Sequence, residues 1–117
     1  MTEQTYELTH EEQMQVANTI ARQMGGVSRI RIMTGAKNFV AMDTENLGGL
    51  QFSFPRIKSK NGYVNKCRIK LNASDLYDFE LWYIGKHGAT LQYSETGLYD
   101  DMLIREFETE TGLRLQL

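Results

Sequence analysis

The chain has 117 residues and a formal net charge of −2; hydrophobic residues make up 41% of it and charged residues 24%. This composition indicates one globular domain and excludes a disordered or collagenous chain, and a single cysteine excludes an internal disulfide. No run of about 18 apolar residues is present, so we expect neither a membrane span nor a membrane partner. The polar, acidic N-terminus does not match a secretory signal, which favours a cytoplasmic protein.

A first helix is predicted after a capping-box pattern, in which Thr9 and Glu12 can satisfy each other's backbone amides. Apolar residues then recur at helical spacing from Val16 to Met24. The pair Gly25-Gly26 should end this helix, because glycine enters the left-handed conformation at low cost.

The pattern then changes to a period of two, which is typical of antiparallel strands with one buried and one wet face. This alternation predicts strands at residues 29–32, 39–42, 50–54, 63–71, 77–83 and 89–93. We expect Ile30 and Ile32 to share one face of the first strand, and Tyr63 to share the apolar face of the fourth with Cys67.

A second helix is predicted from the spacing of Leu103 and Phe107, with Gly112 as its end, and the leucines of residues 113–117 alternate as in a last short strand. The fold class is therefore α+β: one domain over residues 1–117, with residues 1–8 open to disorder. We expect an antiparallel sheet of about five to six strands with an N-terminal and a C-terminal helix on one face. The predicted core contains Ile20, Ile30, Phe52, Phe54, Ile69, Phe79, Leu81 and Phe107.

Charge is distributed unevenly along the chain. Residues 22–70 hold ten of the thirteen Lys and Arg residues and two acidic residues, whereas residues 71–117 hold nine acidic residues. Such a basic segment can bind an anion, including nucleic acid. The alternative is that Lys66, Arg68 and Lys70 pair across a hairpin with Asp78 and Glu80, and that a cation lies over Trp82; we favour this alternative for the hairpin.

The stretch Arg56, Lys58 and Lys60 shows no such partner in the neighbouring sequence. In an extended segment these three cations point the same way, and Pro55 suits a sheet edge or strand end. The candidate binding surface therefore comprises Arg29, Arg31, Arg56, Lys58, Lys60 and Trp82.

The sequence predicts no catalytic centre, no metal site and no cofactor. His10 and His87 are isolated, and Cys67 is predicted to be a buried apolar side chain. Asp75, Asp78 and Glu80 could hold a hard cation, yet basic neighbours across the hairpin explain them better.

Several segments resemble a family of small, uncharacterised proteins of bacteriophages, prophages and related mobile elements. The resemblance begins at Gln23-Met24-Gly25-Gly26, continues through residues 33–39 and the Gly49-Leu50-Gln51-Phe52 strand, and closes with residues 96–103 and 107–113. It covers about residues 12 to 117. It implies a small protein made inside a bacterial cell and implies no activity.

Three functions follow from these observations. The favoured one is a non-catalytic binding protein that acts on a host or phage macromolecule, with a protein as the expected partner and inhibition of a host defence system as one such role. The second is nucleic-acid binding through the basic residues 29–31 and 56–60, with Tyr63 or Trp82 available for stacking. The third and least favoured is a metal-dependent hydrolase. The sequence predicts no oligomeric state.

Overall fold

The computed structural model describes residues 8–42 and 47–116 of the chain. In this part, two helices come first, α1 (His10–Gln23) and α2 (Val27–Thr34). Five strands follow: β1 (Lys37–Met42), β2 (Gly49–Ser59), β3 (Gly62–Leu71), β4 (Tyr77–Gly85) and β5 (Gly88–Leu98). A short 3-10 helix, η1 (Asp100–Met102), leads into α3 (Leu103–Thr111). The expectation of disorder at residues 1–8 falls, apart from Leu8, outside the described residues.

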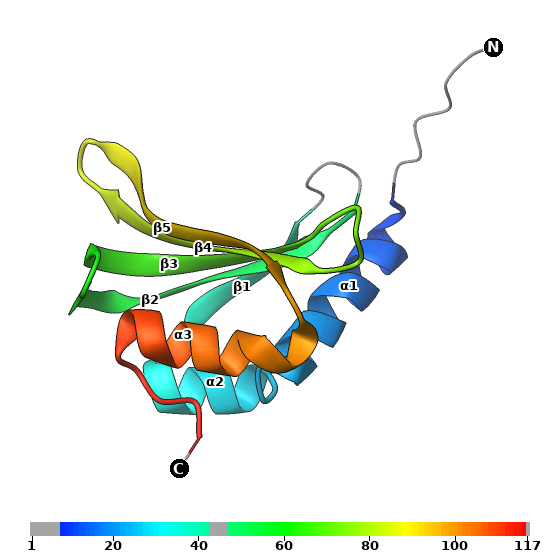
Figure 1. Cartoon of the computed structure of the whole chain (residues 1–117), viewed down its shortest axis with the longest axis horizontal. Coiled ribbons are helices and arrows are strands. Elements are labelled where there is room, and N and C mark those ends of the chain that lie inside the picture. The colour runs from blue at the N-terminus through cyan, green and yellow to red at the C-terminus, as the bar shows by residue number, and fades with distance from the viewer. Residues whose placement is uncertain (1–7, 43–46, 117) are drawn as a thin grey trace.

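The strands form one sheet in the order β1-β2-β3-β4-β5, and every neighbouring pair is antiparallel. The helices lie on one side of this sheet, and in the described part of the chain nothing covers the other side (Figure 1). The predicted α+β class, the antiparallel sheet and the terminal helices on one face are therefore confirmed. We call the uncovered side the open face.

The helix ends follow the predicted signals. Thr9 Oγ1 accepts a hydrogen bond from the Glu12 amide over 3.1 Å, and the Thr9 amide donates to Glu12 Oε1 over 2.9 Å, which completes the capping box. α1 ends before Gly25 and Gly26, whose φ angles are 106° and 97°, and α3 ends at Gly112 in the left-handed conformation. Only glycine adopts such angles without strain.

The core lies between the helices and the sheet. All eight predicted core residues are buried. Phe107 of α3 packs on β2, with its ring centroid 5.9 Å from that of Phe52 and 5.8 Å from that of Phe54. Phe39 of β1 stacks on Phe52 at 5.2 Å. These aromatic contacts fix the helical layer and leave the other side of the sheet free.

The predicted strand at residues 29–32 is wrong, because these residues belong to α2. A two-residue step turns about 200° around a helix, so Ile30 is fully buried while Ile32 is 81% exposed. The buried positions Ile30 and Thr34 follow helical spacing, and Gly35 ends the helix in the left-handed conformation. A run of four alternating residues was too short to distinguish the two periods.

Two further expectations are corrected. Tyr63 is 45% exposed and Val64 is fully buried in its place, because the register of β2 against β3 shifts between Ser53 and Ile57. The predicted last strand is not formed by residues 113–116, the described part of that segment. Leu115 is nevertheless buried in the core, so the alternation there reflects packing of the chain end and not a strand.

Candidate functional site

The central strand β3 places three cations on the open face. Cys67 and Ile69 are fully buried on the helix side, so Lys66, Arg68 and Lys70 alternate onto the open face. In register, Lys66 lies opposite Trp82, Arg68 opposite Glu80 and Lys70 opposite Asp78. The predicted cross-strand pairing of charges is therefore confirmed in its register.

One carboxylate holds this group together. Glu80 Oε2 lies 2.9 Å from Lys70 Nζ, and Glu80 Oε1 accepts a hydrogen bond from Trp82 Nε1 over 2.8 Å. The Arg68 guanidinium lies over the Trp82 ring, 5.8 Å from its centroid. The indole is thus fixed at two points before any partner arrives. We call Lys66, Arg68, Lys70, Glu80 and Trp82 the Trp82 cluster.

Two cations of the Trp82 cluster are weakly partnered. In the part of the chain that the structure describes, the only ion pair of Arg68 is to Glu80 at 3.9 Å, beyond hydrogen-bond distance. Within the described ranges no hydrogen bond from its guanidinium is found, and its Nε is buried without an acceptor. No described residue forms an ion pair with Lys66. Because Glu80 is used by Lys70 and Trp82, the cluster keeps an excess of positive charge.

A shallow cavity of about 330 Å³ adjoins the Trp82 cluster. Its lining combines cations, an amide and aliphatic groups: Gln51, Lys66, Arg68, Trp82, Ile84 and Ala89. Exposed aliphatic side chains surround it on the same face, since Val40 lies opposite Gln51 and Leu91 opposite Trp82. A pocket of this kind can hold an anionic group with an apolar body beside it.

The six predicted surface residues fall on three separate surfaces. Arg29 and Arg31 are exposed on α2, in the helical layer. Arg31 lies over the Phe39 ring at 5.6 Å, and the Arg29 side chain folds back over Gly25. Trp82 is on the opposite side of the sheet. The sequence predicted that Lys66 and Arg68 pair with acidic residues across the hairpin and that a cation lies over Trp82; Arg68 is that cation. It did not include Lys66 and Arg68 in the candidate binding surface, although they lie beside Trp82.

Of the cations of residues 56–60, Arg56 and Lys58 lie beside Tyr63, whereas Lys60 turns to another partner. Arg56 lies over the Tyr63 ring, 4.7 Å from its centroid, and Lys58 is opposite Tyr63 in register. Lys60 pairs with Glu110 of α3 at 3.3 Å, so the expectation that this stretch lacks a partner is wrong for Lys60. The reason is tertiary: the partner lies fifty residues later in the chain. β1 pairs with β2 only as far as Ser53, so Arg56 and Lys58 occupy a part of β2 that has one neighbouring strand.

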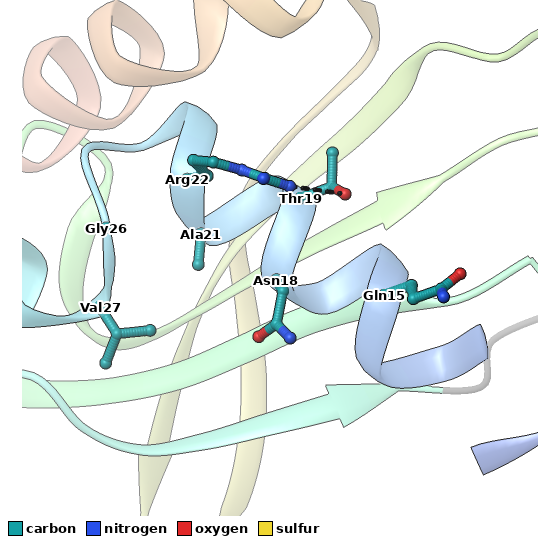
Figure 2. Close-up of a pocket in the computed structure, with 7 residues that line it drawn as sticks. All are labelled: Gln15, Asn18, Thr19, Ala21, Arg22, Gly26 and Val27. Atoms are coloured by element: carbon teal, nitrogen blue, oxygen red, sulfur yellow. Dashed lines mark hydrogen bonds between the residues drawn. The ribbon is translucent and has the colours of Figure 1, made fainter. Parts of the chain in front are cut away.

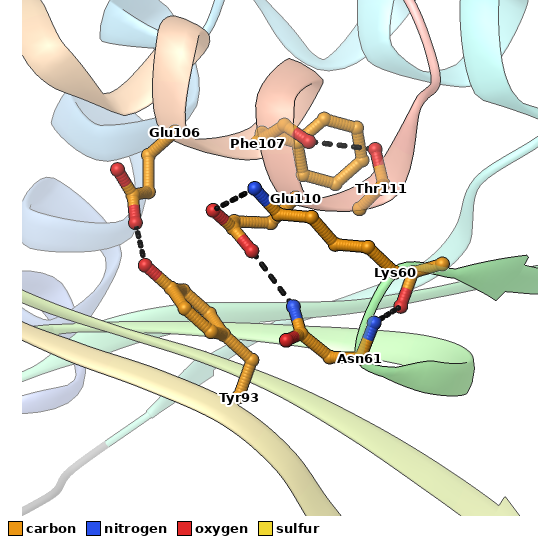
Figure 3. Close-up of polar contacts among 8 residues, drawn as sticks. Lys60, Asn61, Tyr93, Glu106, Phe107, Glu110 and Thr111 are labelled. Carbon is orange, nitrogen blue, oxygen red and sulfur yellow. Dashed lines mark hydrogen bonds and ion pairs between the residues drawn. The ribbon is translucent and has the colours of Figure 1, made fainter.

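Figure 3 shows the polar contacts between α3 and the sheet around that ion pair. The side-chain amide of Asn61 donates to Glu110 Oε1 over 2.7 Å, and the Tyr93 hydroxyl donates to Glu106 Oε2. Burial and this hydrogen bond raise the pKa of Tyr93, which keeps the phenol protonated as the donor. These groups are engaged with one another, so the network holds α3 in place.

A second cavity, of about 640 Å³, lies between α1 and the start of α2. Figure 2 shows Arg22 extended along α1 toward Thr19, to whose Oγ1 it donates over 3.4 Å. The side chains that point toward the strands are Asn18, Ala21 and Val27 (Figure 2). Arg22 is the one charged residue of the lining and bonds to Thr19 of the same lining, so this cavity specifies a ligand less well than the open face does.

Two of the three acidic residues considered for a metal are engaged elsewhere: Asp78 accepts from the Asn72 side-chain amide over 2.9 Å, and Glu80 belongs to the Trp82 cluster. Asp75 stands in the β3–β4 turn with a φ of 62°. Among the described residues, no three His, Cys, Asp or Glu side chains lie close enough together to hold a metal ion. None of the described helices is long and apolar enough to cross a membrane.

In comparisons with protein-family models, curated proteins and solved structures, nothing matches this chain.

Proposed function

We propose that this protein is a small, non-catalytic binding protein whose contact surface is the open face of its sheet. One observation supports this most strongly: Trp82, held in place by Glu80 and Arg68, stands among the exposed aliphatic side chains Ile84 and Leu91. Tryptophan and arginine dominate the energetics of protein interfaces, particularly where apolar neighbours exclude water around them. An uncovered sheet face of this composition suits a folded protein partner.

The setting of this function follows from the resemblance to phage and prophage proteins and not from the structure. On that basis the partner is a host or phage macromolecule in the cytoplasm of a bacterial host, and obstruction of a host defence protein is one role of this kind. Occupying another molecule's surface requires no catalytic residues.

Affinity capture with matched variants tests the proposal. Wild-type protein and the Leu91→Ser and Ile32→Ser variants serve as bait in lysate from the host. Both changes remove an exposed aliphatic side chain, but only Leu91 is on the open face. We expect a partner that the wild-type and Ile32→Ser proteins retain and the Leu91→Ser protein loses, with affinities then measured on the purified partner. Equal retention by both variants would contradict the proposed surface.

A second candidate function, binding of single-stranded nucleic acid, is favoured by one specific contact. Arg56 stacks on Tyr63 at 4.7 Å, and the Tyr63 and Tyr83 ring centroids are 6.5 Å apart. Aromatic rings beside cations are the usual platform for unpaired bases. Fluorescence anisotropy with labelled single-stranded DNA and RNA tests this: salt-sensitive binding that disappears in an Arg56→Ser/Lys58→Ser variant would make nucleic acid the ligand.

A further inference from the structure

We infer that the partner presents a carboxylate to Lys66 and Arg68, flanked by apolar side chains that lie against Trp82 and Leu91. This inference rests on the proposed function and names the chemistry of the partner: an acidic, partly apolar protein segment. Three features of the open face support this inference.

The first feature is that the Trp82 cluster has hydrogen-bond donors without acceptors. A guanidinium carries five N–H donors, and its strongest partner is a carboxylate or phosphate oxygen. The Arg68 side chain is 29% exposed, and its only ion pair among the described residues is the 3.9 Å contact with Glu80. Lys66 lines the same cavity and has no ion-pair partner in the described part of the chain. An incoming anion would meet both cations at one place.

The second feature is the charge pattern, which disfavours a continuous polyanion that runs from Lys66 toward Lys70. Glu80 and Asp78 lie on the open face in the next two rungs that face this side, opposite Arg68 and Lys70. A nucleic-acid strand carries a phosphate at every nucleotide, so a backbone that reached Lys66 and continued in that direction would approach both carboxylates. A single carboxylate can contact Lys66 and Arg68 without approaching Asp78. The charge pattern of this face therefore matches an isolated acidic side chain.

The third feature is the set of apolar side chains around Lys66 and Arg68. Ile84 and Ala89 line the cavity beside them, and Leu91 lies opposite Trp82. Burying these groups favours a partner whose acidic side chain is followed by an aliphatic or aromatic one. Removal of water by such groups also strengthens the ion pair.

Titrations followed by NMR test this chemistry with defined probes. The probes are a short capped peptide of sequence Ser-Glu-Leu-Glu-Ser, the matched peptide Ser-Gln-Leu-Gln-Ser and an oligothymidylate. We expect the Glu peptide to shift the Trp82 indole N–H and the Lys66 and Arg68 amides, with an affinity at least about fivefold above that of the Gln peptide, as for an ion pair worth about 1 kcal/mol. Lys66→Gln should remove this preference. Lys66→Arg should keep it, and so should the control Lys58→Gln, which changes a cation outside the cavity lining.

The other outcomes separate this inference from the proposed function. Equal shifts with the Glu and Gln peptides would overturn the acidic partner and leave the open face as a contact surface. Stronger shifts of the same nuclei with the oligothymidylate would overturn it in favour of a phosphate polymer. If neither peptide shifts these nuclei up to its solubility limit, the inference is wrong, while partner capture that depends on Leu91 would still support the proposed function.

Discussion

The side-chain amide of Asn61, in the β2–β3 turn, donates a 2.7 Å hydrogen bond to Glu110 on the last helix, 49 residues further along the chain (Figure 3). Lys60 adds an ion pair to the same carboxylate at 3.3 Å. Glu110 is buried, so these two contacts satisfy a carboxylate that is shielded from water. This contact joins the far end of the sheet to the helical layer and thereby fixes the sheet whose other face is exposed.

We predict that Glu110→Ala lowers the free energy of unfolding by about 1 to 3 kcal/mol, because the change leaves the half-buried Asn61 amide without its acceptor. Lys60→Ala should cost less than about 1 kcal/mol, since the lysine end of the pair is well exposed. Urea titrations of both variants measure the difference. A cost for Lys60→Ala equal to that of Glu110→Ala would show that the ion pair, and not the hydrogen bond, anchors α3.

A core substitution tests the position of the sheet relative to the helices. Phe79 is fully buried, and its ring centroid lies 6.2 Å from that of Tyr93 on the adjacent strand. Phe79→Ala should therefore cost about 3 to 5 kcal/mol, the usual range for emptying a buried aromatic site. Tyr99→Ala, at a ring that is 62% exposed, is the control and should cost less than about 0.5 kcal/mol in the same chemical denaturation. Similar costs for both would contradict the packing described.

A glycine in β2 permits close approach of the backbone of β3. A methyl group on Gly49 would lie 2.5 Å from the Ile69 carbonyl oxygen, which is a backbone atom that cannot turn away. We expect Gly49→Ala to lower the free energy of unfolding by about 1 to 3 kcal/mol through this overlap. Thermal melts of this variant and of Ser53→Ala, a control on the same strand, measure the difference. Ser53→Ala should be nearly neutral. A neutral Gly49→Ala would mean that the two strands are further apart than described.

Alkaline pH should destabilise the fold. Burial, and to a smaller extent the Glu80 carboxylate, raises the pKa of the Cys67 thiol well above its ordinary value of 9.0. The pKa of Tyr93 is likewise raised above 10.0 by burial and by its hydrogen bond to Glu106. The unfolded chain ionises both groups at their ordinary values, so their contribution to stability is complete below pH 9.0 and is lost as pH rises above it.

Thermal unfolding midpoints measured across the alkaline range check this prediction. The midpoint of the wild-type protein should fall as the pH rises above about 9, and a Cys67→Ala/Tyr93→Phe variant should show a shallower fall from its own starting value. An unchanged slope in that variant would assign the alkaline loss of stability to other groups.

The elements that the sequence predicts well are those with long or redundant signals. Thr9 and Glu12 form the capping box because both partners lie within four residues, and the buried row through Ile69 follows from a strand of ten residues. The strand at residues 29–32 failed because four residues fit either period. Tyr63 was misplaced because the alternation of β3 breaks between Val64 and Cys67, which are both buried, at the place where the register of β2 against β3 shifts. Strict alternation, as assumed from the sequence, carries no sign of this break.

The site was predictable only in part for the same reason. A short turn joins β3 to β4, so the pairing of Lys66, Arg68 and Lys70 with the next strand follows from local sequence. The sequence does not show which cation forms the close ion pair with Glu80, because that depends on side-chain geometry. The excess positive charge at Lys66 and Arg68 is therefore visible only in the structure. The partner of Lys60 lies on α3, and its choice is set by helix packing through Phe107.

The central claim, that the open face is the contact surface, is tested most directly by site-specific photocrosslinking in host cells. A photoreactive amino acid replaces Leu91 on the open face in one strain and Ile32 on α2 in another; both side chains are exposed. Our account predicts one discrete crosslinked adduct from position 91, lost when Trp82→Ala is added, and none from position 32. A discrete adduct from position 32 with none from position 91 would contradict it.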